Sequence, residues 1–303
     1  MIKEDISISI IIPHKNSSLL LTRLLSSIKT TISYQVIVID DNSNDREFSM
    51  IQKMQRQYNF ELYKNDGLFA GGARNTGLKY AKGKWVLFAD SDDFYLPTFS
   101  DILKRHINSN ADLIICNVSS CDSETLEPAE RSRYINMMFN EALSDGNINE
   151  LRCKFLAPWS KIIRRSLIVN NNIRFDEIPA GNDMWFSIQI AVKAKEIVLE
   201  KEQLYCVTIS SGSITTTFSK EKFKSRFLAT LKINDYIRLN GYEKYQSSIL
   251  YYIGKAISLG FNELFFVLIQ CYKHHSNLFI GASNFLRLNR TIKKRQNKYT
   301  KNE

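Results

Sequence analysis

Three aspartates within four residues, Asp90, Asp92 and Asp93, follow the apolar run 85–89. Carboxylates this close repel one another unless a cation joins them. The run is short, apolar and bounded by polar residues, which predicts a buried strand. Ligands bind at the carboxyl ends of strands in open α/β sheets, so the cluster predicts a Mg²⁺ or Mn²⁺ site that serves a phosphate-bearing ligand. The competing interpretation is that these aspartates only cap a helix beginning near Pro97.

A second acidic pair, Asp40 and Asp41, ends another apolar run at 35–39. We expect this pair at the same sheet edge as Asp90 and Asp92. A carboxylate there can accept the N–H of a base or the hydroxyls of a ribose. Acidic pairs also follow apolar strands in phosphoacceptor receiver domains, but those lack a second acidic cluster on a later strand.

The segment 71–77, Gly-Gly-Ala-Arg-Asn-Thr-Gly, is neither a P-loop nor a dinucleotide fingerprint. It opens a predicted helix at 73–81, whose N-terminus can face anionic oxygen. Arg74 is expected in the first turn, where the helix dipole disfavours a cation. An anionic ligand would explain that arginine, and an ion pair with a structural aspartate is the alternative.

The elements that must position these residues alternate regularly along the chain. Near-continuous apolar strands with intervening helices predict an α/β fold with a mainly parallel sheet covered on both faces. Pro13 is expected to stop the first strand. The predicted strands are 7–12, 35–39, about 60–63, 85–89 and 112–116, and the predicted helices are about 20–28, 46–58, 73–81 and 98–108.

Charge divides the chain of 303 residues, whose net charge is +10. Residues 218–303 hold 16 basic and 5 acidic residues, whereas residues 1–217 hold 25 and 26. We therefore predict a near-neutral catalytic domain at 1–217 and a basic helical region at 218–303. Five scattered cysteines without metal-ligand spacing predict reduced thiols, and no signal peptide precedes the first strand, so a cytoplasmic location is expected.

The motifs resemble, in order, those of family 2 glycosyltransferases, which are inverting, metal-dependent enzymes with the GT-A fold. The resemblance covers about residues 5–210, and its downstream part is similar to the acceptor-side motifs of bacterial polysaccharide enzymes. The matching segments are Ile-Ile-Ile-Pro at 10–13, Val-Ile-Asp-Asp-Asn-Ser at 38–43, Ala-Arg-Asn-Thr-Gly-Leu at 73–78, Phe-Ala-Asp-Ser-Asp-Asp at 88–93, Ala-Pro-Trp-Ser-Lys at 157–161 with Arg-Arg-Ser-Leu at 164–167, and Gly-Asn-Asp-Met-Trp-Phe at 181–186.

This resemblance implies roles for the donor-side residues. Asp41 would recognise the uracil or other base, and Asp40 would assist or be structural. Arg74 and Asn75 would lie against the donor nucleotide. Pro13, in the first motif, would border the same ligand.

Within the acidic motif, the family's metal ligand is followed five residues later by proline. Pro97 follows Asp92 by five, so Asp92 would be the direct metal ligand. Asp90 would act on the ribose or in the outer shell of the metal, beside Ser91. Asp93 could simply cap the following helix.

Inverting transfer also needs a base for the acceptor hydroxyl. The resemblance places this role on Asp183, at the start of a helix predicted at 184–194. A capping role for Asp183 is the alternative. The chain carries Asn182 where relatives of this type usually have glutamate.

Trp159 and Lys161 are expected on the acceptor side, ahead of a helix predicted at 162–169. An indole can stack on a sugar ring, and a lysine can hold an acceptor phosphate or hydroxyl. Packing of Trp159 in the core is the alternative.

The region from about 220 to 295 predicts three or four helices. Its apolar run 258–271 is too short to span a bilayer, so core packing, an in-plane membrane face and an oligomer contact all stay open. The basic tail 287–301 suits an anionic membrane surface. It has one aromatic residue, Tyr299, and no recognised nucleic-acid module, so nucleic-acid binding is not expected.

These observations favour an inverting transfer of sugar from a nucleotide diphosphate, expected to be UDP, to a saccharide or lipid-linked saccharide in bacterial surface polysaccharide synthesis. A nucleotidyltransferase would need a glycine-rich basic loop after the first strand, where residues 13–16 are Pro-His-Lys-Asn. The alternative from another class is a non-catalytic module that binds a nucleotide sugar or docks to membranes.

Overall fold

The computed structural model describes residues 6–210, 218–278 and 280. Its contacts divide the chain into two compact units, residues 1–225 and 226–303. The division falls inside helix α9 (Lys220–Leu239), somewhat beyond the change in composition at 217/218. Each unit is described separately below.

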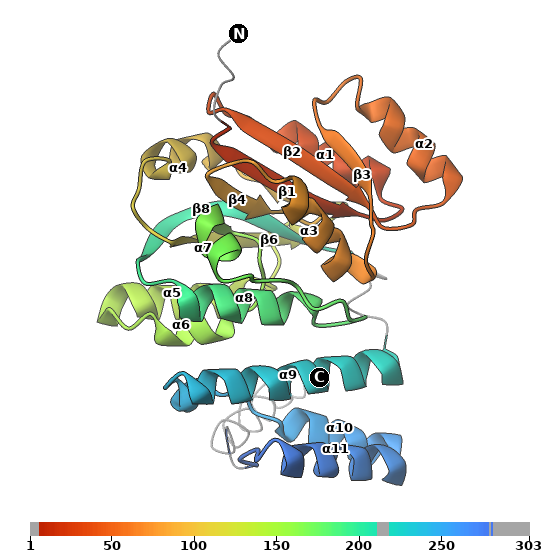
Figure 1. Cartoon of the computed structure of the whole chain (residues 1–303), viewed down its shortest axis with the longest axis vertical. Helices are drawn as coiled ribbons and strands as arrows, with labels where there is room; N and C mark the ends of the chain where they lie inside the picture. Colours follow the sequence, from red (N-terminus) through yellow and green to blue (C-terminus); the bar gives the residue numbers. More distant parts are fainter. Residues whose placement is uncertain (1–5, 211–217, 279, 281–303) are drawn as a thin grey trace, which may run out of the picture. The chain divides into compact units, whose positions relative to one another are not determined.

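The first unit is built on one eight-stranded sheet in the order β3-β2-β1-β4-β7-β6-β8-β5 (Figure 1). The four strands β3, β2, β1 and β4 are parallel, β7 runs antiparallel to both of its neighbours, β6 and β8 are parallel, and β5 runs antiparallel to β8. The expected mainly parallel α/β sheet is confirmed. The strands are β1 (Ile8–His14), β2 (Tyr34–Asp40), β3 (Glu61–Lys64), β4 (Trp85–Phe88), β5 (Phe94–Tyr95), β6 (Leu113–Asp122), β7 (Lys161–Arg164) and β8 (Ile197–Ile209).

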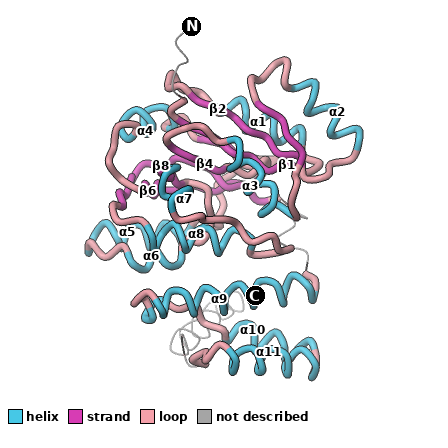
Figure 2. Tube along the Cα trace, in the orientation of Figure 1, coloured by secondary structure: helices cyan, strands magenta, loops and turns pink. Residues whose placement is uncertain are grey.

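Helices cover both faces of the sheet because crossovers between parallel strands are right-handed. The connections through α1 and α2 step outward from β1 to β3, whereas α3 returns to β4 and so covers the opposite face, in front of the strands in Figure 1. Figure 2 shows the same alternation of helix and strand. The helices of this unit are α1 (Ser18–Ser27), α2 (Asp45–Met54), α3 (Phe69–Tyr80), α4 (Phe99–His106), α5 (Arg133–Asp145), α6 (Asn149–Lys154), α7 (Arg165–Asn170) and α8 (Asn182–Lys193).

Two helix predictions on the ligand-binding side need correction. Residues 161–164 form strand β7, and the helix expected from residue 162 begins only at Arg165. A short apolar run does not distinguish strand from helix by its period, and here pairing with β4 and β6 decides. Helix α3 begins at Phe69, four residues before the predicted start.

Two glycines of α3 lie at close contacts. A Cβ on Gly77 would lie 2.4 Å from Ile11 Cγ2 on β1, and one on Gly71 would lie 2.0 Å from the Asp176 carbonyl oxygen. Cβ atoms in close-packed interiors do not approach their neighbours this closely. Glycine therefore lets α3 sit directly on β1 and against the segment before α8.

Pro13 lies inside β1 and does not stop it, which corrects the sequence expectation. The Ile11 carbonyl accepts from the β4 side and the His14 carbonyl from the β2 side, so Pro13 faces the β4 side. Pairing with β4 has ended by then, at Phe88. The missing N–H therefore costs no ladder hydrogen bond.

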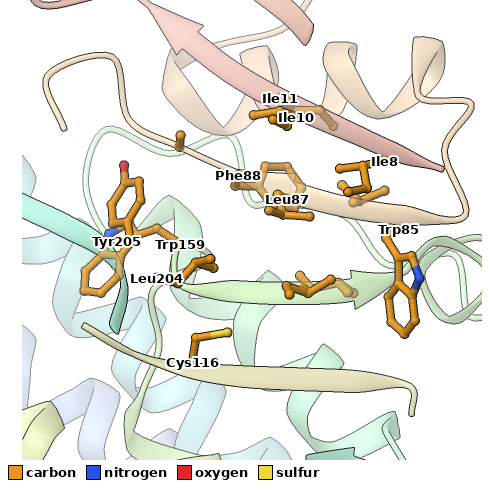
Figure 3. Close-up of a cluster of buried hydrophobic side chains, with 14 of the residues drawn as sticks. Ile8, Ile10, Ile11, Trp85, Leu87, Phe88, Cys116, Trp159, Leu204 and Tyr205 are labelled. Carbon is orange, nitrogen blue, oxygen red and sulfur yellow. The ribbon is translucent and has the colours of Figure 1, made fainter. Parts of the chain in front are cut away.

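A continuous apolar core lies beneath the carboxyl ends of these strands. Ile8, Ile10 and Ile11 of β1 pack with Leu87 and Phe88 of β4, all essentially without exposed surface. Figure 3 shows Trp85 at one end of this cluster and Trp159 beside Tyr205 at the other. All five cysteines are free and buried. This rigid layer fixes where the polar strand ends lie.

The second unit contains the rest of α9, a short 3₁₀ turn (Glu243–Tyr245), α10 (Leu250–Leu259) and α11 (Phe261–Lys273). Helices α10 and α11 pack against each other, and only Gly260 separates them. Within the described part of the chain, no helix combines the length and apolar character needed to cross a bilayer. The expected basic tail at 287–301 lies outside the described residues, as does the N-terminus before residue 6.

Candidate active site

Sheet topology gathers the candidate residues at one edge. β1, β2 and β4 are parallel, so the positions that follow them, around His14, Asp40 and Asp90, share that edge. β7 is antiparallel to β4, with Val86 opposite Ile163, so its first residue, Lys161, also lies there. We call this edge the rim.

The acidic loop at the rim is anchored from β8. Tyr205 Oη accepts a hydrogen bond from the Asp90 backbone N–H at 2.8 Å. Asp93 Oδ1 accepts from the Thr208 N–H at 2.7 Å. Burial, together with Asp92 and Asp90, raises the pKa of Asp93 well above its ordinary value.

Asp93 is therefore not a helix cap. Helix α4 begins after Thr98 without any side-chain cap, and strand β5 immediately follows Asp93. Only 2% of the Asp93 residue surface is exposed. Its carboxylate ties the acidic loop to β8, a role that neither sequence interpretation foresaw.

Asp92 is held through its backbone carbonyl. The Asp92 carbonyl accepts from Arg23 and, at 2.9 Å, from Thr208 Oγ1. Burial and then the charge of Asp90 raise the pKa of the Asp92 carboxyl. A carboxylate destabilised in this way gains most from a cation beside it.

The carboxylates of the acidic loop fit a cation that is held jointly by the protein and by a bound ligand. Among residues 6–210, 218–278 and 280, no three His, Cys, Asp or Glu side chains form a group able to hold a metal ion. Within the acidic loop, Asp90 and Asp92 are partly exposed, whereas Asp93 is buried. Mg²⁺ is commonly bound by one or two carboxylates plus substrate phosphates, which is the arrangement that Asp90 and Asp92 could supply.

Arg74 lies at the centre of the rim. Its Nη2 is 2.5 Å from Asp90 Oδ1, its Nη1 donates to Asn182 Oδ1 at 3.0 Å, and its guanidinium lies over the Phe175 ring. Because α3 begins at Phe69, Arg74 is in the second turn, and the expectation of an unfavourable first-turn cation is wrong. Contacts with Asp90 and Asn182 hold it at the rim.

Asp183 lies in the first turn of α8, which faces the same rim. The N-cap is Gly181, with φ 79°, so Asp183 is not the cap. Burial is the main cause that raises the pKa of Asp183, and the negative charge of Asp90 raises it further. The positive charges of Arg74 and Lys161 lower that pKa and so oppose the rise. Asp183, Arg74, Asp90 and Lys161 come from four separate parts of the chain and share one electrostatic environment.

Asn75 serves a different purpose from its neighbour Arg74. Its Oδ1 accepts from the Phe175 N–H at 2.9 Å, and its Nδ2 donates to the Phe175 carbonyl at 3.0 Å and to Glu177 Oε1 at 3.1 Å. These bonds fasten α3 to the segment before α8. The Asn75 amide thus has partners within the chain, and its contact with a donor nucleotide stays a prediction.

At the other end of the rim, Asp40 occupies a buried, inner position and Asp41 a less buried, outer one. Asp40 is buried and accepts from the Ser43 N–H at 3.3 Å, with His14 Nδ1 at 3.6 Å. Burial lowers the pKa of His14, and Asp40 opposes that change. Asp41 is less buried and accepts from Asn65 at 2.6 Å. The outer position is the one accessible to a ligand.

Trp159 and Lys161 are both buried, and their expected role on the acceptor side stays a prediction. Lys161 is 2% exposed, and its Nζ donates to the carbonyls of Phe155 and Ala157 at 2.6 and 2.8 Å. Trp159 is buried and stacks on Tyr205, with ring centroids 6.0 Å apart (Figure 3). The packing alternative is confirmed for Trp159, and Lys161 is an internal support of the loop that leads to β7.

Sequence reasoning missed several rim residues. Tyr205 and Thr208 lie on β8, more than a hundred residues after the acidic loop, and carry no local motif. His14 and Arg23 were also overlooked, although His14 ends a strand. Ser91 was predicted, and its Oγ is 2.7 Å from Ser17 Oγ, which links the loop to the start of α1.

A parallel sheet that gathers carboxylates and an arginine at its strand ends defines an α/β ligand-binding protein of the nucleotide-binding type. The model of the family Glycosyl transferase family 2 matches residues 9–169, more than half of the chain. The chain therefore belongs to this glycosyltransferase family, as its motifs predicted.

Similar proteins agree with this assignment. Putative glycosyltransferase EpsH of Bacillus subtilis is 25% identical over 241 residues, which are 73% of this chain and 66% of EpsH. Poly(ribitol-phosphate) beta-N-acetylglucosaminyltransferase TarS of Staphylococcus aureus is 27% identical over 214 residues, which are 67% of this chain and 36% of TarS. The chain thus spans about two thirds of the first relative and about one third of the second.

Solved structures show the shared fold. The crystal structure of S. aureus TarS 1-349 in complex with UDP-GlcNAc aligns with a TM-score of 0.64 at 19% identity, over 87% of this chain and 80% of that one. Mannosyltransferase PcManGT from Pyrobaculum calidifontis in complex with GDP-Man and Mn²⁺ aligns with a TM-score of 0.50 at 14% identity, over 89% and 85%. The first unit therefore has the GT-A, Rossmann-like fold.

Proposed function

We propose that the chain transfers a sugar, with inversion, from a UDP-sugar to a saccharide hydroxyl during assembly of a bacterial surface polysaccharide. The observation that carries the proposal is the joint placement of Asp183, Arg74 and Asp90 at the rim, beside the acidic loop. Family membership supports glycosyl transfer, and the UDP-GlcNAc complex of TarS supports a uridine nucleotide.

The rim residues suit distinct steps. Asp41, at the outer end, would accept the N–H of a base, and the buried pair Asp40 and His14 would support the loop that carries it. Arg74 holds Asp90 in place for hydrogen bonds to a ribose. A divalent cation bound by Asp92 would neutralise the charge of the departing diphosphate.

Asp183 is the proposed base. As the acceptor hydroxyl oxygen forms its bond to the anomeric carbon, the hydroxyl proton passes to the Asp183 carboxylate and the bond to the diphosphate breaks. A pKa raised by burial makes this carboxylate a stronger proton acceptor than one in water. Arg74 and Lys161 limit the rise, which favours the ionised form that a base requires.

A panel of nucleotide sugars tests the proposal. The chain is incubated with UDP-, GDP- and dTDP-sugars, with and without Mn²⁺, and release of nucleoside diphosphate is measured with and without saccharide acceptors. Metal-dependent release from a UDP-sugar, enhanced by an acceptor, is expected. Binding of UDP and Mn²⁺ by calorimetry without turnover on any donor would instead indicate the non-catalytic binding module.

A further inference from the structure

Helix α11 of the second unit exposes a row of large apolar side chains. Tyr272 is 82% exposed, Phe261 78%, Phe265 57% and Leu268 43%. They recur at steps of four, three and four residues, so at 3.6 residues per turn they fall within a sector of about 60°. We call these four side chains the α11 stripe. The opposite face of α11, around Val267 and Cys271, is the buried one.

An exposed, ordered apolar row needs a partner, because soluble proteins rarely leave such surfaces in water. Helix α11 spans thirteen residues, about 20 Å, which is shorter than the hydrocarbon core of a bilayer. Three of the four stripe residues are aromatic, the type that favours the boundary between lipid headgroups and acyl chains. The partner that this chemistry fits is a surface with an apolar layer beneath polar headgroups.

Charge identifies the surface as anionic. From Leu264 to Asn302 the sequence contains no aspartate or glutamate but eight lysines and arginines. The first of these, Lys273, directly follows the last stripe residue and is itself exposed. Each basic residue near an anionic membrane adds attraction. Two copies of the chain meeting through their stripes would instead bring two strongly basic segments together, which like-charge repulsion disfavours.

We propose that the α11 stripe and the basic run that follows it bind the chain to the surface of an anionic lipid bilayer. The stripe supplies apolar contact with the acyl layer, and the basic run supplies attraction to acidic headgroups. This binding needs neither donor nor acceptor and is independent of which sugar is transferred. A chain held in this way would meet acceptors that are themselves attached to lipid.

Vesicle flotation tests the proposal with the full chain, without nucleotide sugar. Phosphatidylcholine vesicles that contain about 30 mol% phosphatidylglycerol are compared with pure phosphatidylcholine vesicles at low and high salt. The chain is expected to float with the anionic vesicles, and to do so at least tenfold less with neutral vesicles or at high salt. Equal flotation with both vesicle types, or none with either, would overturn the proposal.

Substitutions separate the two contributions. Phe265→Asp should weaken flotation with anionic vesicles at least tenfold, whereas Leu143→Asp, at a comparably exposed position on α5, should not. Changing Lys293, Lys294 and Arg295 together to Gln should weaken flotation with anionic vesicles to a similar extent. The matched control, in which Lys29, Lys53 and Arg56 of the first unit are changed to Gln, should float like the unmodified chain. Circular dichroism checks that each variant folds, and turnover of a water-soluble acceptor should be unchanged in all four.

Self-association is distinguished in the same experiment. Sedimentation of the full chain should show the same oligomeric state for the unmodified protein and Phe265→Asp. If Phe265→Asp converts a dimer to a monomer and leaves flotation unchanged, the stripe is an interface between copies and the proposal is wrong.

Discussion

The rim of the first unit and the α11 stripe of the second both depart from the usual distribution of side chains, but in opposite ways. At the rim, charged groups such as Asp93, Arg74 and Lys161 are buried, and each has a hydrogen-bond partner within the chain. At the stripe, large apolar groups are exposed. Partners within the chain fix the side chains of the rim, whereas the proposed partner of the stripe is a surface outside the chain.

This difference predicts where substitutions act. Changes at the rim should alter chemistry, donor binding or folding stability, because buried charges depend on fixed partners. Changes at the stripe should leave all three intact and alter only attachment.

The largest effect is expected for Asp183→Asn. Removing a general base costs typically about 10²–10⁴-fold in rate, while the amide keeps the size of the side chain. The rate of transfer, measured as release of UDP, should fall by that factor. The affinity for UDP and Mn²⁺, measured by calorimetry, should stay nearly unchanged. Undiminished transfer would remove Asp183 as the base and leave the rim without its proposed acceptor of the proton.

Asp92→Ala should act on the donor. Loss of one carboxylate from a cation shared with the diphosphate should weaken the metal-dependent part of UDP affinity by about 10–100-fold. Calorimetry with and without Mn²⁺ measures this part directly. Asp101→Ala, an exposed aspartate on α4, is the matched control. Unchanged metal dependence in Asp92→Ala would place the cation elsewhere.

Lys161 should make the folding stability of the first unit depend on pH. Burial lowers its pKa in the folded state to about 7, whereas an unfolded lysine titrates near its ordinary value of 10.5. Between these values the unfolded chain holds the extra proton, so this group makes stability rise with pH, by up to about 1.4 kcal/mol per pH unit. In Lys161→Met, this contribution should vanish.

Urea unfolding at pH 7 and at about pH 9.5, which lies below the unfolded pKa, measures the difference between the unmodified chain and Lys161→Met. Lys53→Met, an exposed lysine on α2, is the control and should keep the pH dependence of the unmodified chain. An identical pH dependence in Lys161→Met would mean that the buried amine does not titrate in this range.

The smallest effects, on folding stability, are expected from replacing one helical glycine in each unit. Gly77→Ala should destabilise the first unit by about 1–3 kcal/mol, because its Cβ would overlap Ile11 on β1. Gly254→Ala on α10, where an added Cβ would meet no atom within 4 Å, should stabilise by up to about 1 kcal/mol through helix propensity. Thermal unfolding of both variants checks the signs, and destabilisation by Gly254→Ala would show that α10 is covered.

Local pattern was sufficient to predict the α/β sheet, the family and the main rim carboxylates. Apolar runs of strand length made β1, β2 and β4 recognisable, and parallel strands necessarily bring Asp40 and Asp90 to one edge. Asp183 followed from its motif and lies in the electrostatic environment of Arg74 and Asp90. The sheet and its acidic edge needed only residue type, spacing and the direction of the strands, whereas the family and the role expected for Asp183 came from the resemblance of the motifs.

Local sequence was least informative where burial or distant partners decide the position of a side chain. Lys161 and Trp159 looked suited to a saccharide, because indole and ammonium groups commonly bind sugars and phosphates. Pairing of β7 between β4 and β6 instead carries both inward, onto Phe155 and Tyr205. Arg74 was expected in a first turn because the spaced glycines hid the true start of α3.

By itself, then, the sequence determined which chemical groups are candidates for the rim, and order along parallel strands is enough to bring Asp40 and Asp90 to one edge. The tertiary structure alone decided which of those groups stay available. Asp93 and Asn75 are engaged by Thr208 and Phe175, whereas we expect Asp92 and Asp183 to keep their carboxylates for a ligand. The physical reason is that hydrogen-bond partners a hundred residues away, set by β8 and the segment before α8, leave no signal in local sequence.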